Sequence, residues 1–158
     1  MWGKTCAVIV ALIAMAIGSM AHGGEAALKN ADALGVADAL SVADAWVPTT
    51  EKVGGDVPLL LTIHNEAGAE DALLRVRCPV ANFSERHTVD RGEGAPAMRS
   101  VRSIPIAAST TTVLKADGYH IMLLQTRQPL AAGDKFTCAI DFQKAGTIET
   151  EVNVRSLP

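Results

Sequence analysis

Four side chains that can bind a soft metal ion occur between residues 87 and 122: His87, Met98, His120 and Met122, separated by ten, twenty-one and one residues. The last two lie in a run of aromatic and branched apolar residues, which predicts a strand. Because alternate side chains of a strand point to the same face, His120 and Met122 should project side by side. Two glycines and a proline within residues 91–96 predict a turn that brings Met98 back near His87.

The ligand types indicate which metal such a site would hold. Thioether sulfur is soft and uncharged and favours Cu(I), whereas imidazole suits copper, zinc and iron. No carboxylate belongs to the set, so nothing in it offsets a second positive charge. We therefore expect one Cu(I) ion per chain. Each residue alone has an ordinary explanation, a methionine in the core or a histidine on the surface, so the prediction depends on the spacing of all four.

This spacing, His-x10-Met-x21-His-x-Met, resembles the signature of the periplasmic Cu(I) chaperones of the PCu(A)C family. The resemblance covers about residues 44 to 155. It implies a cupredoxin-like Greek-key β-sandwich with the four ligands at one exposed end, and a carrier that is not an enzyme. It also implies delivery of Cu(I) to the CuA subunit of cytochrome c oxidase, in some cases alongside a Sco-type thiol protein. Many members have a methionine directly after the first histidine, and Thr88 stands there instead.

The composition is that of one domain of ordinary size, with 158 residues of which 49% are hydrophobic. The formal charge of −3 argues against a nucleic-acid partner, which requires basic patches. From Trp46 onward, short apolar runs alternate with turn residues, which predicts an all-β sandwich or barrel with no substantial helix. We expect strands at 57–63, 72–76, 98–105, 110–114, 120–125, 136–142 and 147–154, with Trp46, Tyr119, Ile121 and Phe142 in the core.

Residues 1–21 have the layout of a secretory signal peptide. Lys4 supplies a positive start, and the apolar run from Cys6 to Ile17 is too short to span a bilayer. Cys6 stands at the start of the apolar run rather than at its end, so no lipoprotein anchor is expected. Cleavage after Ala21 would give an exported, periplasmic chain with no membrane span.

Cleavage there would also make His22 the new N-terminus. A terminal amine and an adjacent imidazole can chelate Cu(II) together, which suggests a second, weaker copper site, with chance as the alternative explanation. If the hypothesis is right, the EPR spectrum of added Cu(II) changes in the His22→Ala variant. An unchanged spectrum rejects it.

Residues 22–43 are expected to form a flexible linker before a copper-binding domain at 44–158. A six-residue repeat begins at Ala31, Ala37 and Ala43, and its third copy starts the first strand of the domain. We interpret the repeat as a local duplication rather than a solenoid. Gly35 and the short length disfavour a stable isolated helix.

Two cysteines, Cys78 and Cys138, remain after the expected cleavage. An even number of cysteines in an exported protein favours a disulfide. Their separation of sixty residues would stabilise the fold by about 4 kcal/mol through loop entropy. The alternative is a reduced pair that binds Cu(I), but no Cys-x-x-Cys spacing supports it.

Two other functions remain open at this point. A copper storage or resistance protein would use the same site, and a deletion strain would then be copper-sensitive without losing oxidase activity at low copper. A copper redox enzyme would use His22, and its turnover of oxygen or peroxide would depend on that residue. No catalytic arrangement stands out elsewhere: Ser84 and His87 lack an orienting acid, and His64 is interpreted as a surface residue.

Overall fold

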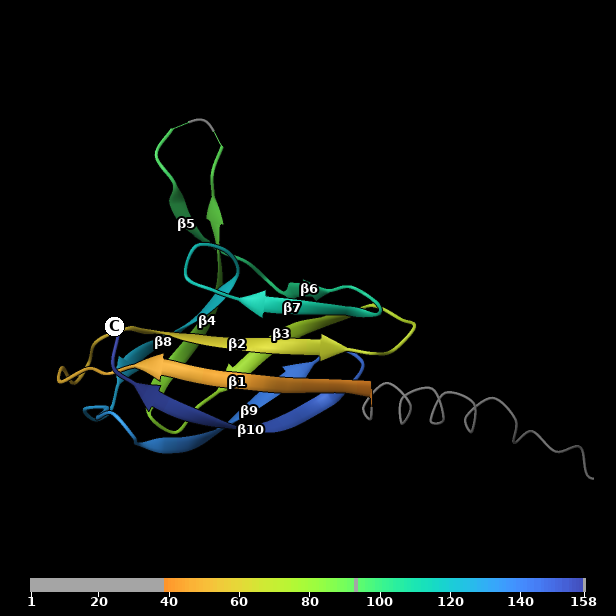
Figure 1. The fold of residues 1–158 in the computed structure, drawn as a ribbon. Helices are drawn as coiled ribbons and strands as arrows, with labels where there is room; N and C mark the ends of the chain where they lie inside the picture. The colour runs from red at the N-terminus through yellow and green to blue at the C-terminus, as the bar shows by residue number, and fades with distance from the viewer. Residues whose placement is uncertain (1–38, 93, 158) are drawn as a thin grey trace, which may run out of the picture.

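The computed structural model describes residues 39–92 and 94–157. The expected signal peptide, His22 and residues 22–38 of the expected linker lie outside them. Ten strands account for the secondary structure of the described residues (Figure 1): β1 (Leu40–Pro48), β2 (Val57–Asn65), β3 (Asp71–Arg77), β4 (Ala81–Asp90), β5 (Ala97–Ser100), β6 (Ile104–Ile106), β7 (Thr110–Leu114), β8 (His120–Thr126), β9 (Lys135–Phe142) and β10 (Gly146–Arg155).

The strands form one continuous hydrogen-bonded sheet that curls on itself. Its order is β5-β4-β8-β2-β1-β10-β9-β3-β6, and β7 also pairs with β2. The β1–β10 pair is parallel, and the other pairs are antiparallel. β3 and β4, near the two ends of the order, lie next to each other without a backbone ladder. The side chains of Ser84 and Arg86 bridge them by donating to the carbonyl oxygens of Val76 and Leu74. The all-β prediction is confirmed.

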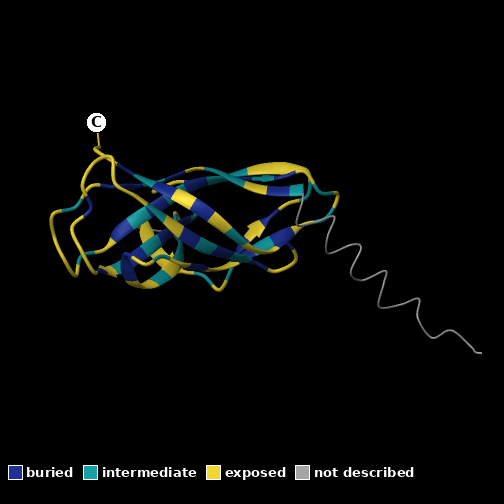
Figure 2. Ribbon diagram, turned by 90° about the horizontal axis from the view of Figure 1, so that it is seen from below, coloured by how far each residue is buried: buried dark blue, intermediate teal, exposed yellow. Residues whose placement is uncertain are grey.

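Alternation along the strands builds the core between the layers (Figure 2). In β2 every second residue from Val57 to Asn65 is buried, and Leu59, Leu61 and Ile63 are at most 2% exposed. Each such side chain contributes about 1.5–3 kcal/mol through its removal from water. Ile121 and Phe142 are buried as predicted, and Tyr119 packs against the core while partly exposed.

Trp46 departs from the core prediction. It is half-buried, and the guanidinium carbon of Arg155 lies 5.7 Å from the centre of its ring. The cause is an irregularity in β1, where Asp44 has a φ of 50° and the register with β2 shifts between Ala43 and Trp46. The core positions of β1 are therefore the neighbours Ala45 and Val47.

Beyond shifts of one or two residues at strand ends, the strands differ from the sequence-based expectation in three places. β1 begins at Leu40, four residues before the domain boundary expected at Asp44, because Leu40 to Ala43 pair with β2. The expected strand 98–105 is divided into β5 and β6, which pair with β4 and β3 respectively. β4 was not predicted, because seven of its ten residues in the segment 81–90 are polar or charged.

A buried carboxylate fixes the turn between β9 and β10. Asp71 is 5% exposed and accepts hydrogen bonds from the backbone N–H groups of Ala72, Lys144 and Ala145 at 2.7, 2.9 and 2.9 Å. Replacing Asp71 with alanine should lower the free energy of unfolding by about 3 kcal/mol, because it leaves backbone donors unpaired in the interior. Urea denaturation measures the change. Lys144→Ala is the control, since only the backbone of Lys144 makes the contact; equal stabilities of the two variants would contradict the assignment.

Candidate metal centre

The β4–β8 register brings the two candidate histidines together. His87 is the direct cross-strand partner of His120. Directly opposed residues in an antiparallel pair have Cβ atoms about 5 Å apart and point to the same face. Their rings meet edge to face, with centroids 5.7 Å apart and planes at 83°. The predicted meeting of His87 and His120 is thus found in the structure.

The two methionines lie on the same face. Met122 follows His120 by two residues on β8, so both side chains share one face of the strand. On the other side of β4, Ser100 pairs with His87 and Met98 pairs with Val89. Met98 is therefore diagonal to His87 on that same face, within about 8 Å. The chain does return between β4 and β5 as predicted, with Met98 two residue pairs along the ladder from His87.

His120 is held in one tautomer. Its Nδ1 lies 3.0 Å from the carbonyl oxygen of Gly118. A carbonyl can only accept, so Nδ1 carries the proton and donates it. The Nε2 atom keeps its lone pair and is the atom that can bind a metal. A ring nitrogen fixed by a backbone carbonyl is the usual support of a metal-binding histidine.

His87 is oriented by a carboxylate. Its Nε2 lies 2.8 Å from Oε2 of Glu85, which precedes it by two residues on the same face of β4. An ionised carboxylate only accepts, so Nε2 donates and Nδ1 has the lone pair. That Nδ1 is buried and has no hydrogen-bond partner among the described residues. An unpaired buried acceptor costs about 1–3 kcal/mol, and a bound metal ion would satisfy it.

Exposure varies across the four side chains. His120 is 1% exposed, Met122 and His87 are half-buried, and Met98 is 55% exposed. Met98 lies on the β4–β5 hairpin, which projects from the body of the sandwich (Figure 1). The four candidates therefore run from a buried position on β8 to an accessible one on the hairpin.

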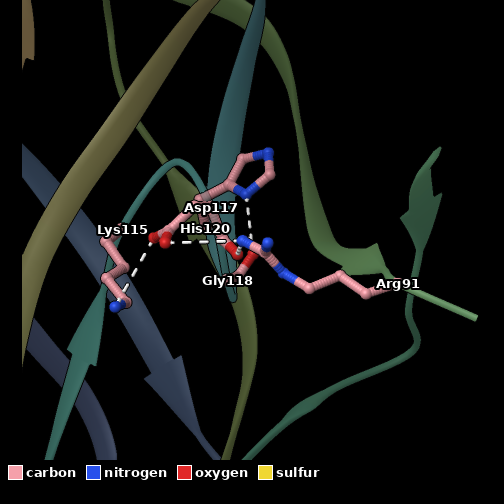
Figure 3. A network of polar contacts seen from close by, with 5 residues as sticks. All are labelled: Arg91, Lys115, Asp117, Gly118 and His120. Atoms are coloured by element: carbon pink, nitrogen blue, oxygen red, sulfur yellow. Dashed lines mark hydrogen bonds and ion pairs between the residues drawn. The ribbon is translucent and has the colours of Figure 1, made fainter. Parts of the chain in front are cut away.

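A polar network joins this hairpin to the loop before β8 (Figure 3). Arg91, just after β4, donates from Nη2 to the carbonyl oxygen of Asp117 at 2.9 Å and lies 3.5 Å from its carboxylate. Lys115 lies 3.5 Å from the same carboxylate. The next residue in the loop is Gly118, whose carbonyl oxygen accepts the hydrogen bond from Nδ1 of His120. Arg91 thus links the strand pair that carries Met98 to the loop that orients His120.

The sequence interpretation missed Glu85, Arg91 and Gly118 as supporting residues. Recognition of β4 as a strand would have revealed Glu85, since positions 85 and 87 then share a face. Arg91 and Gly118 act through loop geometry, for which the sequence carries no signal. His64 lies on β2, where its Nδ1 bonds with the hydroxyl of Thr111 at 3.0 Å. Within the part of the chain that the structure describes, no three His, Cys, Asp or Glu side chains cluster as a metal site.

The two cysteines form the predicted disulfide. Cys78 follows β3 directly and is joined to Cys138 of β9, with Cα atoms 4.4 Å apart. Cys138 is fully buried. The pair connects neighbouring strands of the sandwich, and neither cysteine lies on β4, β5 or β8, so a structural role is indicated.

Residues 40–154 match the family model "Putative lipoprotein LpqE-like". The chain belongs to the LpqE-like family. The match begins at the first residue of β1 and spans all ten strands except the last residue of β10. The family's description names lipoproteins. The absence of a lipid anchor at Cys6 stays a prediction, because Cys6 lies outside the described residues. No functionally curated protein matches this LpqE-like chain.

Solved PCuAC domains share the fold of this LpqE-like protein. The apo PCuAC domain from PmoF1 has a TM-score of 0.64 at 18% identity, covering 75% of this chain and 95% of that one. The copper-bound PCuAC domain from PmoF2 gives 0.63 at 16% identity, covering 75% and 94%. Cu(I)-bound DR1885 from Deinococcus radiodurans gives 0.60 at 22% identity, covering 87% and 97%. The predicted cupredoxin-like fold and the resemblance to PCu(A)C proteins are confirmed.

The described residues, 39–92 and 94–157, include no helix with the length and apolar character needed to cross a membrane.

Proposed function

We propose that this LpqE-like protein is a periplasmic Cu(I) chaperone, a carrier and not an enzyme, that binds one copper ion through His87, Met98, His120 and Met122. The observation that carries the proposal is the common face of these four side chains, set by the registers of β4 with β8 and β5. Two imidazole nitrogens have uncommitted lone pairs there, and one of them is buried with no partner among the residues that the structure describes. The fold shared with copper-bound PCuAC domains supports the same conclusion.

The arrangement suits release as well as binding. Imidazole and thioether ligands are neutral, so the site favours a monovalent ion over a divalent one. Met98 is the most exposed of the four and lies on the projecting hairpin. An acceptor's thiolate or imidazole would displace it first and then reach the ion held by the more buried ligands. We propose the CuA subunit of cytochrome c oxidase as the acceptor, with a Sco-type thiol protein as a further partner.

The test is a Cu(I) competition titration combined with X-ray absorption. After the expected signal peptide, the sequence contains just two methionines, Met98 and Met122, and two cysteines, which form the disulfide. We expect one ion per chain with two sulfur and two nitrogen neighbours, and any thioether signal then has a known origin. A copper environment of nitrogen and oxygen alone would reject the proposed ligands. Retained oxidase activity in a copper-sensitive deletion strain would instead support storage or resistance.

Acidification should release the copper. Protons compete with Cu(I) for the lone pairs of Nδ1 of His87 and Nε2 of His120, whereas thioether sulfur does not protonate in this range. We expect the Cu(I) affinity to be at least about tenfold lower at about pH 5 than at about pH 7, because histidines must be deprotonated to bind a metal. A competition titration at both pH values measures the change. Equal affinities would exclude both imidazoles as ligands.

A further inference from the structure

A groove of about 580 Å³ lies over the seam where β3 and β4 meet without a backbone ladder. Below it, the side chains of Ser84 and Arg86 hold the two strand edges together. The groove is outside the proposed copper site but shares strand β4 with it. Its lining includes Leu74, Arg75, Arg77, Phe83, Arg86 and Arg127.

The groove is strongly basic on a chain whose net charge is −3. Four arginines line it, and none of its described lining residues is an aspartate or glutamate. Arg77 forms an ion pair with Asp141 at 3.0 Å. The other three form no ion pair within the described residues: Arg86 donates to backbone carbonyls, Arg127 donates to Asn82 at 2.8 Å, and Arg75 is exposed. Most of the positive charge of the groove is therefore not neutralised within residues 39–92 and 94–157.

Apolar side chains lie beside these charges. Phe83 is 62% exposed and Leu74 is 40% exposed, and both line the groove. Exposed aromatic residues next to arginines are typical of the energetically important part of protein interfaces. Arginine also binds carboxylates through two parallel hydrogen bonds. The surface therefore matches a protein segment that carries carboxylates around an apolar side chain, better than it matches a small inorganic anion.

The position of the groove relates it to copper exchange. Phe83 and His87 point to the same face of β4, four residues apart, which places them about 13 Å from each other along the strand. A protein seated in the groove would bring its own surface against the proposed copper face. We propose that the groove docks an acidic segment of the protein that receives copper from this chain. This inference depends on the proposed function.

The test measures second-order Cu(I) transfer from the full mature chain to a purified apo CuA domain. The double variant Arg75→Glu/Arg127→Glu should transfer copper at least about tenfold more slowly at low salt, because electrostatic steering is lost. The salt dependence of the rate should also flatten. Lys144→Glu is the matched control, since it reverses an exposed charge outside the groove and should leave the rate unchanged. Thermal unfolding confirms that each variant is folded.

The outcomes separate the docking inference from the copper site. A Cu(I) titration of each variant should show unchanged affinity, because neither arginine contacts the four ligands. A transfer rate of the double variant equal to that of the unmodified protein would overturn the docking inference, and so would the absence of any transfer to the CuA domain. In either case, Cu(I) binding with two sulfur neighbours in X-ray absorption would still support the copper site. The unmodified protein could also bind vesicles of equal parts phosphatidylglycerol and phosphatidylcholine. If the double variant loses this binding but transfers copper at an unchanged rate, the groove binds anionic lipid and the docking inference is overturned.

Discussion

Replacing Met122 with leucine should weaken Cu(I) binding at least about a hundredfold while the apo protein unfolds at nearly the same temperature. Loss of a residue that merely supports a ligand typically costs tenfold to a hundredfold in metal affinity, so loss of a direct ligand should cost more. Leucine has a similar volume and no sulfur, and swaps of this kind usually cost less than about 1.5 kcal/mol of stability. Met122 is half-buried on the same strand face as His120, so water replaces its sulfur less easily than it would replace an exposed ligand.

Matched variants isolate the contribution of the sulfur atom. Met98→Leu should weaken binding in the same direction but less, because this exposed residue is the more easily replaced by solvent. Val89→Leu is the control, since Val89 lies opposite Met98 on the same face and contributes no sulfur. X-ray absorption of each methionine variant should show one sulfur neighbour fewer. An affinity for Cu(I) that stays constant in Met122→Leu would remove the thioether from the proposed site.

The common face of the four proposed ligands follows from strand registers that the sequence predicts only in part. The alternation of His120 and Met122 is visible in the amino-acid sequence, because both lie in an apolar strand. His87 lies in a segment with Glu85 and Arg86 that has no such pattern, yet β4 forms because its backbone pairs with β8 and β5. Tertiary pairing thus overrode the weak local preference, as is common for strands.

The orienting contacts were beyond sequence reasoning for a different reason. Glu85 is not one of the four proposed donors, but its carboxylate bonds with Nε2 of His87 and leaves Nδ1 of that ring for the proposed ion. Its charge therefore orients His87 without belonging to the proposed ligand set. The Arg91–Asp117 contact depends on how the hairpin lies over the loop 115–119, which is decided by packing between distant segments. Spacing along the chain holds no information about it.

The disulfide gives the second large effect. Replacing both Cys78 and Cys138 with alanine should lower the free energy of unfolding by about 4 kcal/mol, because the unfolded chain loses a closed loop of sixty residues. For a domain of this size, that corresponds to a decrease in melting temperature on the order of 15 °C. Urea and thermal denaturation measure both quantities. The double replacement is the appropriate variant, since a single one leaves an unpaired thiol. A loss below about 1 kcal/mol would contradict the loop-entropy account.

The same variant also decides what the cysteines do. The closed loop from Cys78 to Cys138 contains all four proposed ligands, so the disulfide constrains their part of the unfolded chain without touching the metal. Below its melting temperature, the double variant should therefore bind Cu(I) with nearly unchanged affinity. Mass spectrometry of the native protein after alkylation should find no free thiol at these two positions. A large loss of Cu(I) affinity together with two alkylated thiols would instead make the cysteines ligands, because a reduced pair supplies the thiolates that bind Cu(I) most strongly.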